Sequence, residues 1–187
     1  MKIGIVGLGL IGGSLAAALM GFEDYEIVGV VRRQETADYA LSHGICDRVT
    51  LDAAEVIPQA DVTVLCTAPA TVIAYLNQYK DAFKQGSLVT DVCGIKTAIM
   101  EAARVLPEDV DFIGCHPMAG TQYSGFAHTR ANMFHRAPLV VVPPQQMDDF
   151  VRLDVLERLK GLLAPCGFGM YTLSTAEHHD EVIAFTS

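Results

Sequence analysis

The sequence predicts an α/β fold in which a doubly wound, mainly parallel sheet is flanked by helices. Short apolar runs alternate along the chain with longer segments whose apolar residues recur at helical spacing. The first run is almost wholly apolar, which is typical of a strand covered on both faces. The 187 residues are 51% hydrophobic, so the chain can bury a sizeable core. Alternating strands and helices around one core favour parallel strands joined by helical crossovers.

The first strand and helix meet at a glycine-rich turn. An apolar run over residues 3–6 is followed by glycines with the spacing GxGxxG and by a helix over residues 14–20. In this pattern the first glycine permits a tight turn, the second lets backbone approach a pyrophosphate, and the third lets helix and strand pack closely. The start of the helix then directs unpaired N–H groups at the phosphates. The context predicts a Rossmann-like dinucleotide site, the alternative being a tight turn without a ligand. The residues expected at this site are Gly7, Leu8, Gly9, Leu10, Ile11 and Gly12.

The end of the second strand bears on which dinucleotide binds. This strand is predicted over residues 25–31 and runs into Arg32 and Arg33. An NAD site of this kind has an acidic residue about 20 residues after the glycines, where it holds the ribose 2′-hydroxyl. Two arginines suit a 2′-phosphate instead. The sequence therefore favours NADP, and the alternative is a solvated arginine loop in a protein that accepts either cofactor.

The remaining elements follow from the same alternation. Gly44 is a natural stop for the second helix. Pro69 prevents the strand before it from continuing to pair. The predicted helices cover residues 36–42, 70–83, 95–106, 150–163 and 175–185, and the predicted strands cover residues 61–66, 88–90, 112–115, 138–142 and 168–173, with a short strand between residues 45 and 49.

Three polar side chains each directly follow an apolar run. They are Thr67, Asp91 and His116. Ligands of open α/β sheets bind outside the carboxyl ends of the strands, so we expect these residues near a ligand. Thr67 and Pro69 are expected to contact the cofactor. His116 can take a proton from a substrate hydroxyl while hydride leaves the same carbon, unless it only orders its loop. Asp91 has either a catalytic or a purely structural role.

Composition excludes several classes of partner. The formal net charge is −9 without a basic block, which argues against nucleic acid and anionic membrane surfaces. No apolar run is long enough to span a bilayer, and the N-terminus does not read as a signal peptide. The five cysteines are widely spaced, which indicates reduced thiols and a cytoplasmic protein. No metal site is expected, because the adjacent His178 and His179 would point in different directions on a helix.

Three segments resemble the prephenate/arogenate dehydrogenase family of tyrosine biosynthesis. They are the glycine-rich turn over residues 7–14, the TDVCGIK segment over residues 90–96 and the GCHPMAGT segment over residues 114–121, and His179-Asp180 also fits. The HPMAG segment is the most specific of these, and the likeness covers essentially the whole chain.

The resemblance implies an oxidoreductase that decarboxylates prephenate to 4-hydroxyphenylpyruvate, or arogenate to tyrosine, with NAD(P) as hydride acceptor. It implies that His116 is the catalytic base, that Asp91 belongs to the catalytic site and that the substrate is bound by His116, Lys96, Gly120, Thr121 and His179. Gly94 stands where many members have a serine that binds the substrate hydroxyl. Another NAD(P)-dependent oxidoreductase and a non-catalytic NAD(P)-sensing module are the alternatives.

The resemblance also implies how the domains are divided. Residues 1–173 would form the NAD(P)-binding domain, and residues 174–187 would begin a helix that leads to a C-terminal helical domain. In this family that domain forms the homodimer and brings an arginine to the substrate carboxylate. We expect the 187 residues alone to bind cofactor and to turn over prephenate poorly or not at all.

Overall fold

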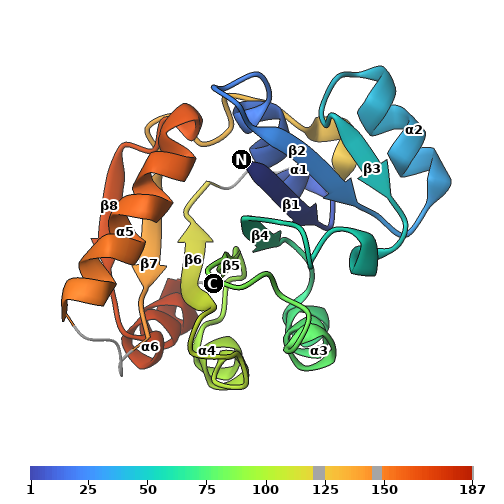
Figure 1. Ribbon diagram of the computed structural model, residues 1–187. Coiled ribbons are helices and arrows are strands. Elements are labelled where there is room, and N and C mark those ends of the chain that lie inside the picture. The colour runs from blue at the N-terminus through green and yellow to red at the C-terminus, as the bar shows by residue number, and fades with distance from the viewer. Residues whose placement is uncertain (120–124, 145–148, 187) are drawn as a thin grey trace.

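The computed structural model describes residues 1–119, 125–144 and 149–186. In these residues the chain forms an eight-stranded sheet with the strand order β3-β2-β1-β4-β5-β6-β7-β8 and helices on both faces (Figure 1). The strands are β1 (Lys2–Val6), β2 (Glu26–Val30), β3 (Arg48–Thr50), β4 (Val62–Leu65), β5 (Leu88–Asp91), β6 (Asp111–Pro117), β7 (Pro138–Val142) and β8 (Met170–Leu173). The helices are α1 (Leu10–Leu19), α2 (Gln34–Ser42), α3 (Pro69–Tyr79), α4 (Thr97–Ala103), α5 (Asp149–Leu163) and α6 (Ala176–Thr186), with short 3₁₀ turns at Ala53–Glu55, Phe126–His128 and Ala164–Cys166.

The strand order confirms the predicted doubly wound, mainly parallel sheet. The first six strands run parallel, and β1 lies between β2 and β4, where the strand order reverses. This reversal is the point at which open α/β sheets bind ligands.

The last two strands run against the other six. β7 pairs antiparallel with β6, with Pro117 opposite Leu139, and β8 is parallel to β7. The connection from β6 to β7 leaves and re-enters at the same edge of the sheet, and on its way it crosses α1, where the Arg130 N–H donates to Ser14 Oγ over 3.0 Å. A connection that leaves and returns at the same end of the strands makes the next strand antiparallel.

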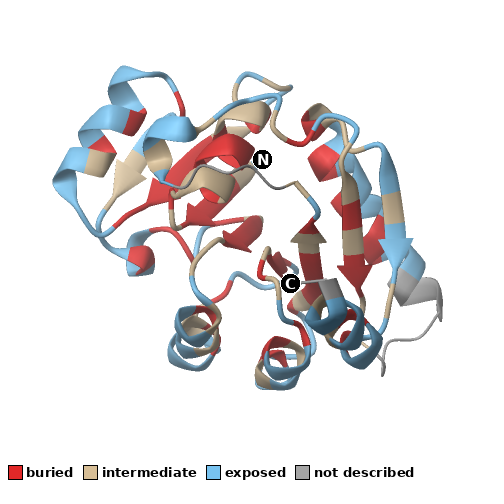
Figure 2. Ribbon diagram, turned by 180° about the vertical axis from the view of Figure 1, so that it is seen from behind, coloured by how far each residue is buried: buried red, intermediate tan, exposed pale blue. Residues whose placement is uncertain are grey.

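Two layers of helices cover the sheet. Helices α1, α2 and α5 bury side chains such as Leu15, Ala40 and Leu159 on one face. On the other face α3 and α4 bury Leu76 and Ile99. Figure 2 shows the resulting buried strands between helices whose outer sides are exposed. The core therefore holds the carboxyl ends of β1, β4, β5 and β6 side by side, at what is called here the carboxyl edge of the sheet.

Several predicted element ends differ from the structure. Helix α1 begins at Leu10 rather than at residue 14, so it includes two glycines that weaken an isolated helix. The short third strand begins at Arg48, and Ile45 before it is a buried loop residue. Helices α3 and α4 are shorter than predicted, because apolar spacing does not mark where a last turn loosens. Gly44 lies just after α2 with φ +62°, which confirms it as the stop of that helix.

Candidate active site

The three glycines of the turn have the geometry that the sequence predicts. Gly7 has φ +96°, and a Cβ there would lie 2.7 Å from the Cys66 carbonyl oxygen. A Cβ on Gly12 would lie 2.0 Å from the Gly7 carbonyl oxygen, so only glycine lets helix and strand approach this closely. A Cβ on Gly9 would meet no atom within 4 Å. The turn is therefore closely packed at Gly7 and Gly12 and open beside Gly9.

The surroundings of this turn fit a bound dinucleotide. The N-cap residue of helix α1 is Gly9, which offers no side-chain cap, and the first turn has no acidic residue, so the first N–H groups remain available for an anion. Thr67 lies beside Gly7, and its buried Oγ1 has no hydrogen-bond partner in the described part of the chain. A buried hydroxyl without a partner costs about 1–3 kcal/mol, which a bound polar group would offset. These residues could hold the pyrophosphate region of a dinucleotide.

The other predicted cofactor residues lie around the same edge. Leu8 is a core residue, so only its backbone faces the site, whereas Leu10 and Ile11 are partly exposed. Pro69 is the first residue of α3, directly after β4. Arg32 and Arg33 follow β2, the strand that pairs with β1, and both are exposed.

A buried ion pair lies beneath the ends of β5 and β6. Asp91 and Lys96 have no exposed side-chain area, and their Oδ2 and Nζ atoms are 2.6 Å apart. The Lys96 ammonium also donates to the carbonyl oxygen of Cys93 over 2.7 Å, and Asp91 accepts the Cys93 N–H over 2.9 Å. Burial raises the pKa of the Asp91 carboxyl, and Lys96 together with backbone N–H groups opposes that rise. The pair holds the turn after β5, and neither charged group has surface left for a substrate.

His116 is the last residue but one of β6 and is half-buried. Its Nδ1 is 2.9 Å from Nε2 of His179, which comes from α6. The Nδ1 of His179 is in turn 2.8 Å from Oδ1 of Asp180. Asp180 accepts the N–H groups of Lys96 over 2.6 Å and Thr97 over 2.8 Å at the start of α4. In Figure 1, α4 and α6 lie side by side below β6, which brings these three elements together.

The charges around His116 keep its ring neutral. Burial, together with the nearby Lys96 and His179, lowers the pKa of His116 to about 4 against the opposing effect of Asp180. Burial works to raise the pKa of Asp180, but hydrogen bonds from Thr97, His179 and the Lys96 backbone outweigh it and lower that pKa to about 2. At pH 7 the neutral His116 imidazole is therefore bonded to His179, which is in turn bonded to the Asp180 carboxylate. A neutral imidazole can accept a proton.

The opposite ring nitrogen of His116 faces Gly94. A Cβ built on Gly94 would lie 3.7 Å from both Nε2 and Cε1 of His116 and would meet nothing else within 4 Å. There is thus free space next to the nitrogen that does not bind His179. Glycine at position 94 leaves this space without a side chain.

Two of the residues predicted to bind the substrate already have hydrogen-bond partners within the protein. His179 is 3% exposed and uses both ring nitrogens for His116 and Asp180. Lys96 is fully buried against Asp91. The polar side-chain atoms of both residues are thus bonded within the protein. Gly120 and Thr121 lie outside the described residues.

Asp180 is the site residue that sequence reasoning missed. Its carboxylate binds a helix that begins 83 residues earlier in the chain, a contact that no local pattern indicates. The sequence feature that could have indicated Asp180 is the pair His179-Asp180 near the start of a helix, because both side chains can form hydrogen bonds with neighbouring elements from there. Among the described residues no group of three His, Cys, Asp or Glu side chains could hold a metal ion, and no helix is long and apolar enough to cross a membrane.

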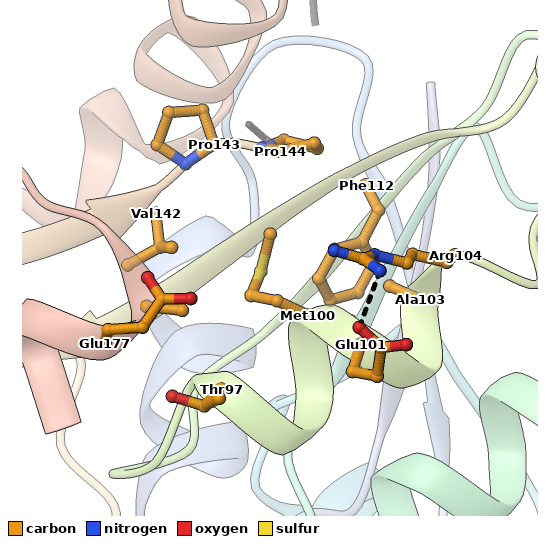
Figure 3. A pocket seen from close by; sticks show the side chains of 11 residues that line it. Thr97, Met100, Glu101, Ala103, Arg104, Phe112, Val142, Pro143, Pro144 and Glu177 are labelled. Carbon is orange, nitrogen blue, oxygen red and sulfur yellow. Dashed lines mark ion pairs between the residues drawn. The ribbon is translucent and has the colours of Figure 1, made fainter. Parts of the chain in front are cut away.

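A separate pocket of about 140 Å³ lies between α4, β6, the end of β7 and the start of α6. Figure 3 shows Met100 and Phe112 inside it and the Glu101–Arg104 ion pair, 2.9 Å long, at its rim. None of the predicted site residues lines this pocket. The chemistry indicated by His116 therefore belongs to the carboxyl edge of the sheet and not to this pocket.

Comparison with known proteins gives consistent results. Residues 16–168 match the family described as prephenate dehydrogenase, nucleotide-binding domain. The prephenate dehydrogenase of Lactococcus lactis subsp. cremoris is 33% identical over 185 residues, which cover 97% of this chain and 48% of that protein. The cyclohexadienyl dehydrogenase of Zymomonas mobilis subsp. mobilis is 28% identical over 191 residues, or 99% of this chain and 62% of that protein. The crystal structure of Synechocystis arogenate dehydrogenase is 36% identical with a TM-score of 0.88 and covers 100% of this chain and 64% of that chain. This chain spans about half the length of the Lactococcus relative.

Proposed function

Since this chain belongs to the family of prephenate dehydrogenase nucleotide-binding domains, we propose that it supplies the cofactor site and the catalytic base of a prephenate dehydrogenase. The reaction would convert prephenate and NAD(P)⁺ to 4-hydroxyphenylpyruvate, carbon dioxide and NAD(P)H. Arogenate, oxidised to tyrosine, is the alternative substrate, and the Synechocystis structure is that of an arogenate dehydrogenase. Relative kcat/KM values of the whole protein for the two substrates decide between them.

One observation carries the proposal. A neutral His116 stands at the carboxyl edge of the parallel sheet, three strands from the glycine turn, with Nε2 towards open space beside Gly94. Three strand spacings of about 4.8 Å separate β1 from β6 by roughly 14 Å. A dinucleotide that lies across the carboxyl ends of these strands extends from the glycine turn towards His116. A substrate would fill the space between the dinucleotide and His116.

The residues of this chain then have defined tasks. A bound nicotinamide supplies the hydride acceptor. His116 Nε2 accepts the proton of the ring hydroxyl as hydride leaves the same carbon. Loss of the ring carboxylate as carbon dioxide leaves its bonding electrons in the ring, which becomes aromatic, and His116 returns the proton to the phenolate oxygen. Because aromatisation is strongly downhill, the protein needs to supply mainly orientation and a proton acceptor.

The test of the base is His116→Gln in the whole protein, with the exposed His178→Gln of α6 as the matched control. Glutamine keeps the approximate size of the ring but cannot accept a proton near pH 7. We expect kcat to fall by about 10²–10⁴-fold while the control stays near the wild-type value. An unchanged kcat and pH profile in His116→Gln would remove the base from the mechanism and refute the proposal.

The cofactor site is tested by a methyl group beside the glycine turn. Gly9→Ala places a Cβ in open space, so the free energy of unfolding should change little, yet that space is where a pyrophosphate would approach. Gly161→Ala on α5, whose Cβ also meets nothing within 4 Å, is the control. We expect Gly9→Ala alone to weaken NAD(P) binding measured by calorimetry. Equal affinity in both variants would contradict a pyrophosphate at this turn.

For the cofactor itself we propose a preference for NADP, supported by exposed Arg32 and Arg33 beside the strand that pairs with β1. Replacing both by alanine should weaken NADP binding and leave NAD binding nearly unchanged, whereas Arg48→Ala on β3 should affect neither. NAD binding at least as tightly as NADP in the wild type would refute this preference. We also propose that residues 1–173 form the cofactor domain and that α6 leads towards a second domain that forms the homodimer, as the resemblance implies.

A further inference from the structure

The contacts behind His116 form one continuous line across three elements. They run from His116 on β6 to His179 and Asp180 on α6, and from Asp180 to the N–H groups of Lys96 and Thr97 at the start of α4. Each step is between 2.6 and 2.9 Å. His179 is almost wholly buried, so water has little access to its two ring nitrogens. The order of donors and acceptors along the line can be worked out from its fixed end.

Asp180 fixes the direction of every bond. Its Oδ1 accepts a backbone N–H from α4 and, as a carboxylate, can only accept from His179, so His179 must carry its proton on Nδ1. In a neutral His179 the Nε2 is then an acceptor. His116 must therefore donate from Nδ1, and its own Nε2 is left without a proton. That nitrogen is the one that faces Gly94.

We propose that His179 and Asp180 are positioning residues that hold His116 in the tautomer whose unprotonated Nε2 faces the substrate. This inference rests on the proposed function, in which Nε2 is the proton acceptor. The line also orients the ring, because His116 cannot rotate about its side-chain bonds without losing the bond to His179. When His116 takes up a proton, the proton is added at Nε2 while the bond from Nδ1 stays in place.

The charged groups that face His116 are consistent with this role. Lys96, at the start of α4, disfavours a positive ring, and Asp180 favours one. Lys96 is itself neutralised by Asp91 at 2.6 Å. His116 is therefore neutral before the reaction. When it becomes charged, the Asp180 carboxylate lies two hydrogen bonds away, beyond His179. A substrate contact by His179 would need one of these bonds to break.

The tautomer can be measured directly in this chain, without turnover. Long-range ¹H–¹⁵N spectra of the histidine rings at pH 7, assigned with His116→Gln, report which nitrogen of His116 carries the proton. We expect the proton on Nδ1 in the wild type and in His179→Gln, whose Oε1 can still accept it. In His179→Leu no acceptor remains, so a substantial Nε2–H population should appear. His178→Leu, at the exposed neighbour, should leave the spectrum of His116 unchanged.

Kinetics of the whole protein supply the second readout. We expect His179→Leu to lower kcat by at least about tenfold with KM little changed, and His179→Gln to restore most of the loss. A proton on Nε2 of His116 in the wild type, or an Nδ1–H tautomer that persists in His179→Leu, would overturn the proposal. If His179→Leu does not fold, Asp180→Asn and the wild-type spectrum still decide it. If the tautomers change as expected while neither His116→Gln nor His179→Leu slows turnover, the line stands and the proposed function fails.

Discussion

Removing Lys96 should destabilise the fold strongly and in a pH-dependent way. In Lys96→Met the carboxyl of Asp91 keeps its place with no exposed area, but its cation is gone. A buried charge that loses its partner typically costs about 3–5 kcal/mol. The alternative for Asp91 is to bind a proton, which burial already favours by raising its pKa.

The size of the effect follows from that second route. Keeping a carboxyl with an unfolded pKa of about 3.9 protonated at pH 7 costs about 4 kcal/mol, at about 1.36 kcal/mol for each pH unit. At pH 5 the same cost is only about 1.5 kcal/mol. The raised pKa belongs to the folded variant, so stability is fully present below the unfolded pKa and is lost as pH rises. A loss of about 4 kcal/mol in a chain of this size lowers Tm by roughly 8–16 °C.

The assay is urea unfolding followed by circular dichroism at pH 5 and pH 7, each variant compared with the wild type at the same pH. Lys84→Met is the control, because Lys84 pairs with Asp61 at the surface with side chains 44% and 37% exposed. Such pairs contribute about 0–1 kcal/mol. The double variant Asp91→Asn, Lys96→Met should recover part of the loss, since it buries no charge. A deficit below about 1 kcal/mol at pH 7, or one equal at both pH values, would refute the reasoning.

Three further results are expected. Gly12→Ala should reduce stability by several kcal/mol in the same urea assay, because its Cβ would lie 2.0 Å from the Gly7 carbonyl oxygen; near-wild-type stability would mean that helix and strand can separate at no cost. Gly94→Ser should change the free energy of unfolding by less than about 0.5 kcal/mol, since its Cβ makes only ordinary contacts at 3.7 Å, and should lower the KM of the whole protein for prephenate; a higher KM would argue against a substrate hydroxyl at this place. Because the pKa of His116 is lowered to about 4, the wild type should lose about 2 kcal/mol of unfolding free energy relative to His116→Gln when the pH falls from 7 to 5. The reason is that the unfolded chain binds the proton at a higher pH than the folded protein does. Parallel pH profiles of the two proteins would show an exposed ring.

Much of the fold could be read from local pattern. Gly7 and Gly12 have a steric reason that the spacing alone conveys, and the apolar runs mark β1, β4, β5 and β6 as buried strands. The antiparallel course of β7 could not be read in this way. It depends on a connection that crosses α1 and returns to the same edge, and such a path is set by packing between residues far apart in the chain, such as Ser14 and Arg130.

The same distinction between local pattern and long-range packing holds for the candidate site. By itself the sequence determined the dinucleotide turn, the family and the place of His116 at a strand end, because these depend on residues close together in the chain. Only the tertiary structure decided that Lys96 neutralises Asp91 and that a ring nitrogen of His179 bonds the ring of His116. The physical reason is that a hydrogen bond has a direction and a length of about 3 Å. Whether a histidine meets a substrate or another ring is therefore settled by how α6 packs against α4 and β6, which no spacing along the chain records.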